Sequence, residues 1–243
     1  MNRYDEVRAG GRLVPGELFT SADDIERKVQ EIGFLPLFAC GIKGLSVEEH
    51  TPAELWFNDN ADGPWEWKGP IIRNGETAYA KYFRNKAVFV SLEWLPRLIN
   101  IRRQMSKPMG YDEERVLRAI ESNENMLSTE IREECGFGRH GATMAERALL
   151  ANTEGGTKAS LDTILTRLQM KGRIVVCDFE YNIDKHGHPY GWGKARYTTP
   201  EILYADRFSL PEESAEESLE AVVGKICSTG LCPNKDAAHR LVL

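Results

Sequence analysis

The chain has 243 residues, of which 42% are hydrophobic and 28% are charged, a composition typical of globular proteins with a sizeable core. No stretch approaches the roughly 18 apolar residues that span a bilayer, and charges interrupt the N-terminus where a secretory signal has an apolar run, so we expect a cytoplasmic protein without membrane segments. The net charge of −6 argues against a nucleic-acid partner unless the charges are unevenly distributed.

The N-terminal part is predicted to contain both helices and strands. Ser21 is suited to cap a helix that runs to Ile32. Alternating apolar residues on both sides of Arg84-Asn85-Lys86 predict a hairpin with a basic tip. A further helix is expected to begin near Ser91 or Trp94 and to include Arg102.

Residues 111–200 have the clearest pattern. Three helices are predicted, over 112–122, from a Ser128 cap to Gly136 or Gly138, and from a Ser160 cap to Gly172. Two strands follow over 173–181 and 194–199, separated by a long turn. This order is typical of a winged-helix domain, a helix-turn-helix followed by a β-hairpin. An extra short helix is expected over 142–151.

These patterns together predict an α+β protein of winged-helix architecture, built of tandem winged-helix-like units. We expect an N-terminal domain over 1–110, a winged-helix domain over 111–200 and an acidic C-terminal tail over 201–243. The tail is rich in glutamate and is interpreted as either an exposed acidic helix or a partly disordered segment.

The charges are strongly segregated along the chain. Residues 68–110 contain nine basic and two acidic residues, whereas residues 1–67 contain six basic and thirteen acidic ones. A basic cluster of this kind can bind phosphates, although solvated helix and strand faces would give the same composition. The cations proposed for DNA binding are Lys81, Arg84, Lys86, Arg102 and Arg103.

The helix over 160–172 supplies a second group of candidates. With its leucines and isoleucine facing inward, Thr163, Thr166, Arg167 and Met170 lie outward or on one flank and are predicted to face the bases. Cations that could then meet phosphates are Lys171, Lys194 and Arg196, while Asp178 and Glu180 would repel them. Packing or dimerisation through the same surface is the alternative.

Aromatic residues accompany the basic segment. Trp65 and Trp67 would share one side of a strand and are candidates for stacking on bases. Burial of these rings in a core is the alternative interpretation.

No catalytic, metal or cofactor motif emerges from the residues. Cys227, Cys232 and His239 lack an evident fourth ligand, and His186 and His188 fit a solvated turn better than a metal site. We therefore predict no metal and no cofactor.

Several short motifs resemble those of a bacterial group known as AlkZ-related proteins. The resemblance spans roughly residues 34–200 and implies a distant relation to AlkZ-type DNA glycosylases, which consist of tandem winged helices and excise alkylated bases. The motifs lie at 34–38, 46–49, 56–57, 64–68, 78–83, 86–94, 168–170 and 190–192.

The resemblance does not extend to the glycosylase reaction. AlkZ-type enzymes use a Gln-x-Gln or Gln-x-Asp motif, and neither motif occurs at Gln30, Gln104 or Gln169, the only glutamines of this chain. Base excision would then need another group, for which Glu48, Glu49 and Glu66 are conceivable.

Three hypotheses follow. The first is a DNA-binding winged-helix protein that recognises duplex DNA, in particular damaged or distorted DNA. The second is a divergent glycosylase that hydrolyses the N-glycosidic bond of alkylated bases without the glutamine motif. The third is a protein-interaction or dimerisation module, and the sequence leaves open whether the chain forms a homodimer.

Overall fold

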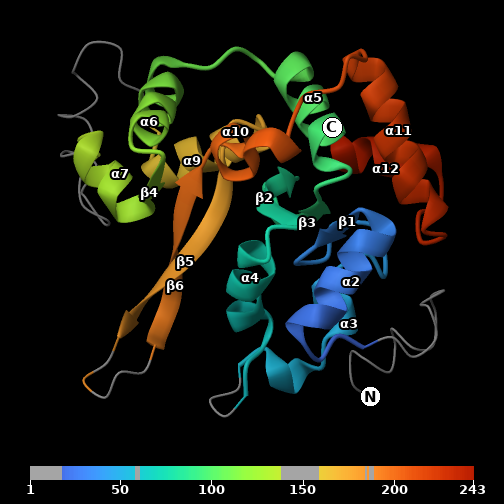
Figure 1. Ribbon diagram of the computed structural model, residues 1–243. Helices are drawn as coiled ribbons and strands as arrows, with labels where there is room; N and C mark the ends of the chain where they lie inside the picture. The colour runs from blue at the N-terminus through green and yellow to red at the C-terminus, as the bar shows by residue number, and fades with distance from the viewer. Residues whose placement is uncertain (1–17, 58–60, 138–158, 184, 186–188) are drawn as a thin grey trace.

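The computed structural model describes residues 18–57, 61–137, 159–183, 185 and 189–243 (Figure 1). Helices surround one six-stranded antiparallel sheet, which confirms the α+β class. The strands are β1 (Phe34–Pro36), β2 (Thr77–Phe83), β3 (Lys86–Ser91), β4 (Asn125–Leu127), β5 (Val175–Ile183) and β6 (Pro189–Thr198). Their spatial order is β1-β3-β2-β5-β6-β4.

The sheet consists of two three-stranded halves. The expected basic-tipped hairpin is formed by β2 and β3, and β1 extends it. In the other half β6 pairs with both β5 and β4. The two halves are joined where β2 meets β5, at the register pair Tyr79 and Val176. The sheet therefore continues across a narrow central junction.

The first hydrophobic core combines both ends of the described chain. It contains Val29 and Phe34 from the N-terminal part, Leu98 from its middle, and Val222 and Leu241 from the C-terminal part. The helices of the N-terminal part are α2 (Ala22–Ile32), α3 (Val47–His50), η1 (Ala53–Leu55), α4 (Pro64–Arg73) and α5 (Leu95–Met105). Those of the C-terminal part are α10 (Pro200–Tyr204), η2 (Ala205–Arg207), α11 (Ala215–Ser228) and α12 (Lys235–Val242).

Residues 201–243 are therefore not an acidic tail, which corrects the sequence-based prediction. Leu219, Val222, Val223 and Ile226 are buried and recur at i, i+3, i+4 and i+7, so α11 has one apolar face. This face packs in the first core, while the glutamates of the first turn face solvent. The acidic composition concealed an amphipathic helix.

A second core lies between α6 (Tyr111–Ser122), α7 (Ser128–Glu134) and α9 (Leu161–Met170). The inward leucines and isoleucine predicted for α9 are all buried. Ser160 caps this helix by accepting a hydrogen bond from Thr163 N, and Gly172 follows its end with a φ of +62°, which favours glycine. Ser128 proves to be the first residue of α7, and Leu127 is its cap. The expected helix over 142–151 and the pair His186 and His188 lie outside the described residues.

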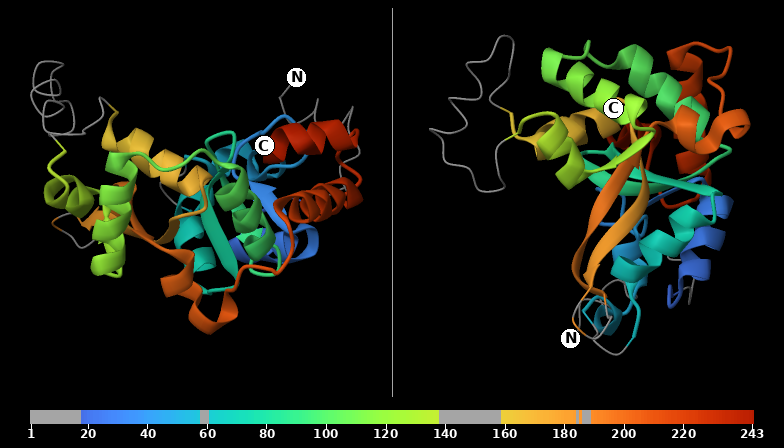
Figure 2. Two further views of the ribbon diagram at one scale, coloured as in Figure 1. Left: turned by 90° about the horizontal axis from the view of Figure 1, so that it is seen from above. Right: turned by 60° about the vertical axis from the view of Figure 1, so that its left-hand side comes forward.

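The helices of the second core and those of the C-terminal part lie on opposite sides of α5. Seen from above, α6, α7 and α9 lie on one side of α5, and α11 and α12 lie on the other (Figure 2, left). The hairpin of β5 and β6 extends away from α6 and α9 and runs beside α4 (Figure 1). Within the described part of the chain, no helix combines the length and apolar character needed to cross a bilayer.

Candidate nucleic-acid interface

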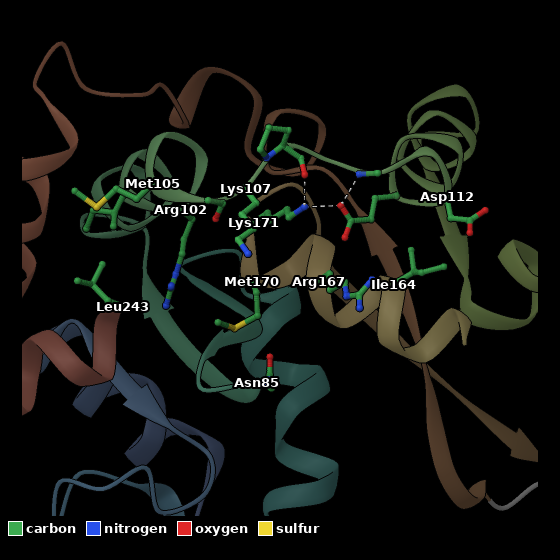
Figure 3. Close-up of a pocket in the computed structure, with 15 residues that line it drawn as sticks. Asn85, Arg102, Met105, Lys107, Asp112, Ile164, Arg167, Met170, Lys171 and Leu243 are labelled. Carbon is green, nitrogen blue, oxygen red and sulfur yellow. Dashed lines mark hydrogen bonds and ion pairs between the residues drawn. The ribbon is translucent and has the colours of Figure 1, made fainter. Parts of the chain in front are cut away.

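A pocket of about 640 Å³ lies between α5, α6 and α9 (Figure 3). The end of α5, the segment 106–110, the start of α6 and the exposed side of α9 form its walls. Asn85 from the β2–β3 turn and the side chain of Leu243 after α12 complete its rim. The pocket thus brings together the basic segment 68–110 and the helix α9, which the sequence singled out separately.

The two side-chain carboxylates of the pocket have cationic partners. Glu113 contacts Lys171 Nζ (Figure 3), and Asp112 accepts a hydrogen bond from Arg115 at 2.8 Å. Glu113 also accepts a hydrogen bond from Gly110 N at 3.0 Å and so caps α6. Lys171, predicted to meet phosphates, is therefore largely neutralised within the protein.

Three other cations of the pocket have no carboxylate partner among the described residues. They come from separate elements: Arg102 from α5, Lys107 from the segment after α5, and Arg167 from α9. Lys107 and Arg167 are exposed, whereas Arg102 is only 6% exposed. Since both carboxylates of the lining are already paired, the pocket carries an excess of positive charge.

Arg102 is held inside the protein by its position on α5. It follows Leu98 and Ile99 by four and three residues and therefore lies on the buried side of the helix. Its guanidinium donates to the carbonyl oxygen of Tyr82, but its Nε has no hydrogen-bond partner. Burial lowers the pKa of Arg102 to about 10, so the side chain is still charged at neutral pH.

The four residues predicted to face bases lie on one side of α9, but with different accessibility. Thr163 and Arg167 are exposed, whereas Thr166 and Met170 are half-buried. Thr166 Oγ1 donates to Asp162 O at 2.7 Å and accepts from Lys81 Nζ at 3.1 Å. Strand β2 therefore covers part of this surface and leaves the flank with Arg167 open.

Gln169 fixes the contact between α9 and β2. Its side chain is 2% exposed, and its Oε1 accepts a hydrogen bond from Lys81 N at 3.0 Å. Its Nε2 donates to Leu165 O within α9 at 3.1 Å. This positioning role was not predicted from the sequence, in which the polar residue beside the apolar stripe of α9 was the available signal.

The remaining cations of the basic segment differ in exposure and in ion pairing. Arg84 and Lys86 are exposed at the hairpin tip, next to the rim residue Asn85, and contact the carbonyl oxygens of Arg240 and Ala39. Arg103 instead forms an ion pair with Glu201 at 2.6 Å and does not line the pocket. The expected DNA contact of Arg103 is therefore not supported by its surroundings.

The cations of the β5–β6 hairpin do not join the pocket. Lys194 donates to Asn182 Oδ1 at 3.1 Å. Arg196 contacts Glu130 and Glu180, both at 3.4 Å. Acidic neighbours within the same hairpin or next to it thus neutralise Arg196.

The two candidate stacking residues lie on helix α4, which corrects the expectation that they share one side of a strand. A proline at the first helical position and Glu66 bonded back to Gly63 N favour the helix here. Trp65 packs against Phe38 and Trp56, with ring centroids 5.8 and 5.6 Å apart, and Trp67 is 6% exposed. Trp67 is therefore buried in the core, whereas Trp65 is half-buried and already packs against rings of the protein.

The carboxylates considered for base excision have local structural roles. Glu48 accepts from Ala39 N, Glu49 from Gly44 N and Glu66 from Gly63 N, at 2.9 to 3.0 Å. None of the three lines the pocket. Among the described residues, no group of three or more His, Cys, Asp or Glu side chains is placed to hold a metal ion.

Comparison with known proteins gives one match. The family model described as AlkZ related matches residues 19–241, which is nearly the whole chain. The protein belongs to the AlkZ-related family. No curated protein matches the chain. No solved structure matches it either.

Proposed function

We propose that this AlkZ-related protein binds duplex DNA on the surface formed by the pocket rim and the open flank of α9. The observation that carries the proposal is the convergence of exposed cations without carboxylate partners in the described chain: Arg84 beside the rim, Lys107 on the α5–α6 segment and Arg167 on α9. Clustered cations of this kind attract phosphates because binding releases condensed counterions from DNA.

The order of elements supports a winged-helix interpretation of residues 111–198. Among the described residues of this segment, which leave out 138–158 between α7 and α9, the order is α6, β4, α7, α9, β5 and β6, and β4 pairs with β6. In this interpretation α9 takes the place of the recognition helix and the β5–β6 hairpin is the wing. Arg167 would then reach a groove, while Lys107 and Arg84 bind the flanking phosphates.

The family relation favours damaged or distorted DNA as the ligand. Base excision is not part of the proposal, because the three candidate carboxylates cap local turns and the glutamine motif is absent. A binding role requires the cations alone.

The test is the salt dependence of binding to a short labelled duplex with 5′-hydroxyl ends, measured by fluorescence anisotropy. Replacing Arg84, Lys107 and Arg167 together by glutamine should weaken binding by roughly 100-fold at moderate salt and make the slope of log K against log salt shallower by about 2.7, or 0.9 for each lost phosphate contact. Binding that does not depend on salt, or a triple variant with the wild-type slope, would contradict the proposal.

A further inference from the structure

Arg102 lies in the pocket with unused hydrogen-bonding capacity. Arg102 is only 6% exposed, its guanidinium donates to one backbone carbonyl, and its buried Nε has no hydrogen-bond partner among the described residues. The other polar atoms of the lining do not satisfy it, since Glu113 is bound to Lys171 and Asp112 to Arg115. A buried cation without a counter-ion is costly, and an anion that enters the pocket would offset that cost.

The rest of the lining describes the kind of molecule that would carry this anion. Four apolar side chains belong to the lining, and three of them, Met105, Met170 and Leu243, lie around Arg102 (Figure 3). The fourth is Ile101. Together they form the apolar wall of the pocket. Thioether sulfurs make favourable contacts with aromatic rings, and the wall contains two of them. Asn85 lies at the rim, and its side-chain amide makes no hydrogen bond within the described residues, so it can both donate to and accept from the polar edge of a ring.

We propose that this pocket binds a phosphate monoester with an aromatic body, of the nucleoside monophosphate type, whose phosphate contacts Arg102. The forked guanidinium matches two phosphate oxygens, and Lys107 and Arg167 supply further positive charge for a dianion. The ring lies against Met105 and Met170, and a pocket of about 640 Å³ is within the size range of small-molecule sites.

Two sources can present this chemistry. One is a free nucleoside monophosphate, and the other is the terminal nucleotide of a DNA strand that carries a 5′-phosphate. An internal phosphodiester of a duplex does not have the same charge. The inference shares Lys107 and Arg167 with the proposed binding of duplex DNA, but it depends on Arg102, which duplex binding does not require.

Calorimetric titration of the protein with adenosine monophosphate tests the site. Binding is expected for the wild type, with adenosine lacking the phosphate binding at least tenfold more weakly. Arg102→Met should weaken the affinity for adenosine monophosphate by about 10- to 100-fold, as expected for the loss of charged hydrogen bonds. Arg118→Met is the matched control, because Arg118 is exposed on α6, pairs with Glu114 and does not line the pocket.

A second variant covers the case in which Arg102→Met does not fold. Met105 is 38% exposed and tolerates a polar replacement, so Met105→Glu places a carboxylate beside Arg102 and should also weaken adenosine monophosphate binding by at least tenfold. The proposal is overturned if the wild type does not bind the probe at about millimolar concentration, if adenosine binds equally well, or if a folded variant binds like the wild type.

The source of the ligand is separated by a strand-end experiment. A single strand with a 5′-phosphate should bind more tightly than the same strand with a 5′-hydroxyl, and Arg102→Met should remove the difference, if strand ends are the ligand. Equal binding of the two strands assigns the site to the free nucleotide. Binding of a duplex with 5′-hydroxyl ends should be the same in Arg102→Met and the wild type, so a failure of either proposal is recognised without the other.

Discussion

The pocket rim and the β5–β6 hairpin both carry cations proposed for DNA binding, but their surroundings differ. On the hairpin, the strand register places Asp178 opposite Arg196 and Glu180 opposite Lys194. At the rim, Arg167 and Lys107 have no carboxylate partner among the described residues. The carboxylates that line the pocket are paired with Arg115 and Lys171 instead. Cross-strand pairs of opposite charge stabilise a sheet and also cancel its field. The positions of nearby carboxylates, rather than the number of cations, therefore decide which surface can attract DNA.

The two regions are also anchored differently. The rim depends on the Gln169 amide, which joins α9 to β2 through Lys81 N. The hairpin is anchored to α4 by cation–π contacts of the buried Lys68. Lys68 Nζ lies 4.2 Å from the ring centroid of Phe179 on β5 and 4.9 Å from that of Trp65. Substitutions at Gln169, Lys68 and the hairpin carboxylates can thus test whether the rim and the hairpin differ in anchoring and in charge.

Replacing Gln169 should have the largest effect, on the free energy of unfolding as well as on duplex binding. Gln169→Leu leaves the Lys81 backbone N–H without its acceptor and should lower the free energy of unfolding by about 2 kcal/mol. Urea denaturation measures this loss. Duplex binding should weaken in the same variant because α9 is no longer held against β2, whereas Gln104→Leu, which removes only a bond to Asn100 on α5, should leave duplex binding unchanged. Equal stability of Gln169→Leu and the wild type would contradict the role assigned to Gln169.

Replacing Lys68 should change the free energy of unfolding by a smaller amount than Gln169→Leu and in the opposite direction. Burial lowers the pKa of Lys68 to about 8, a shift that corresponds to roughly 3 kcal/mol against the charged form at neutral pH. The two ring contacts offset about 2 kcal/mol of this cost, so Lys68→Met should stabilise the protein by about 1 kcal/mol at pH 7.

The pH dependence gives the control for Lys68. Between pH 8 and the ordinary lysine pKa of 10.5 the unfolded state binds more protons than the folded state, so wild-type stability gains a contribution as the pH rises through this window. Lys68→Met should lack this contribution. A wild type and variant with parallel stability profiles from pH 7 to about pH 10 would disprove the assignment.

The smallest effect is expected when the hairpin is made to resemble the rim. Asp178→Asn together with Glu180→Gln removes the carboxylates opposite Arg196 and Lys194, and should strengthen duplex binding by roughly fivefold and steepen its salt dependence by about one unit. Glu212→Gln with Glu216→Gln changes the net charge equally near α11 and is the matched control. An unchanged salt slope would place the hairpin outside the DNA contact.

Local signals in the sequence predicted much of the fold. Ser21 and Ser160 cap the helices that were expected after them, and the basic tip at residues 84–86 connects the predicted strands. The helices α6, α7 and α9 and the strands β5 and β6 also follow from periodicity and turn residues, whereas the short strand β4 was not predicted. These features depend on residues a few positions apart, which a single sequence displays directly.

The site required contacts that are distant along the chain. Burial of Arg102 depends on packing of α5 against β2, where its guanidinium donates to Tyr82 O, and the pocket depends on the junction of α5 with α9. The strand expected at Trp65 and Trp67 proved to be a helix because alternation over three residues is too short to distinguish the two. Charge segregation located the basic segment, but only the folded chain separates Arg103, which has a carboxylate partner, from Lys107, which has none within the described residues.

The junction between the halves of the sheet has a mechanical consequence. The strands β2 and β5 share one register pair, and the Gln169 amide and the Lys81 ammonium add side-chain bonds beside it. A load that pulls α9 away from the β2–β3 turn would concentrate on these few bonds rather than spread along a long ladder. The hydrogen-exchange rate of the Lys81 amide would then report on this separation, because the amide exchanges with solvent faster whenever the two halves separate.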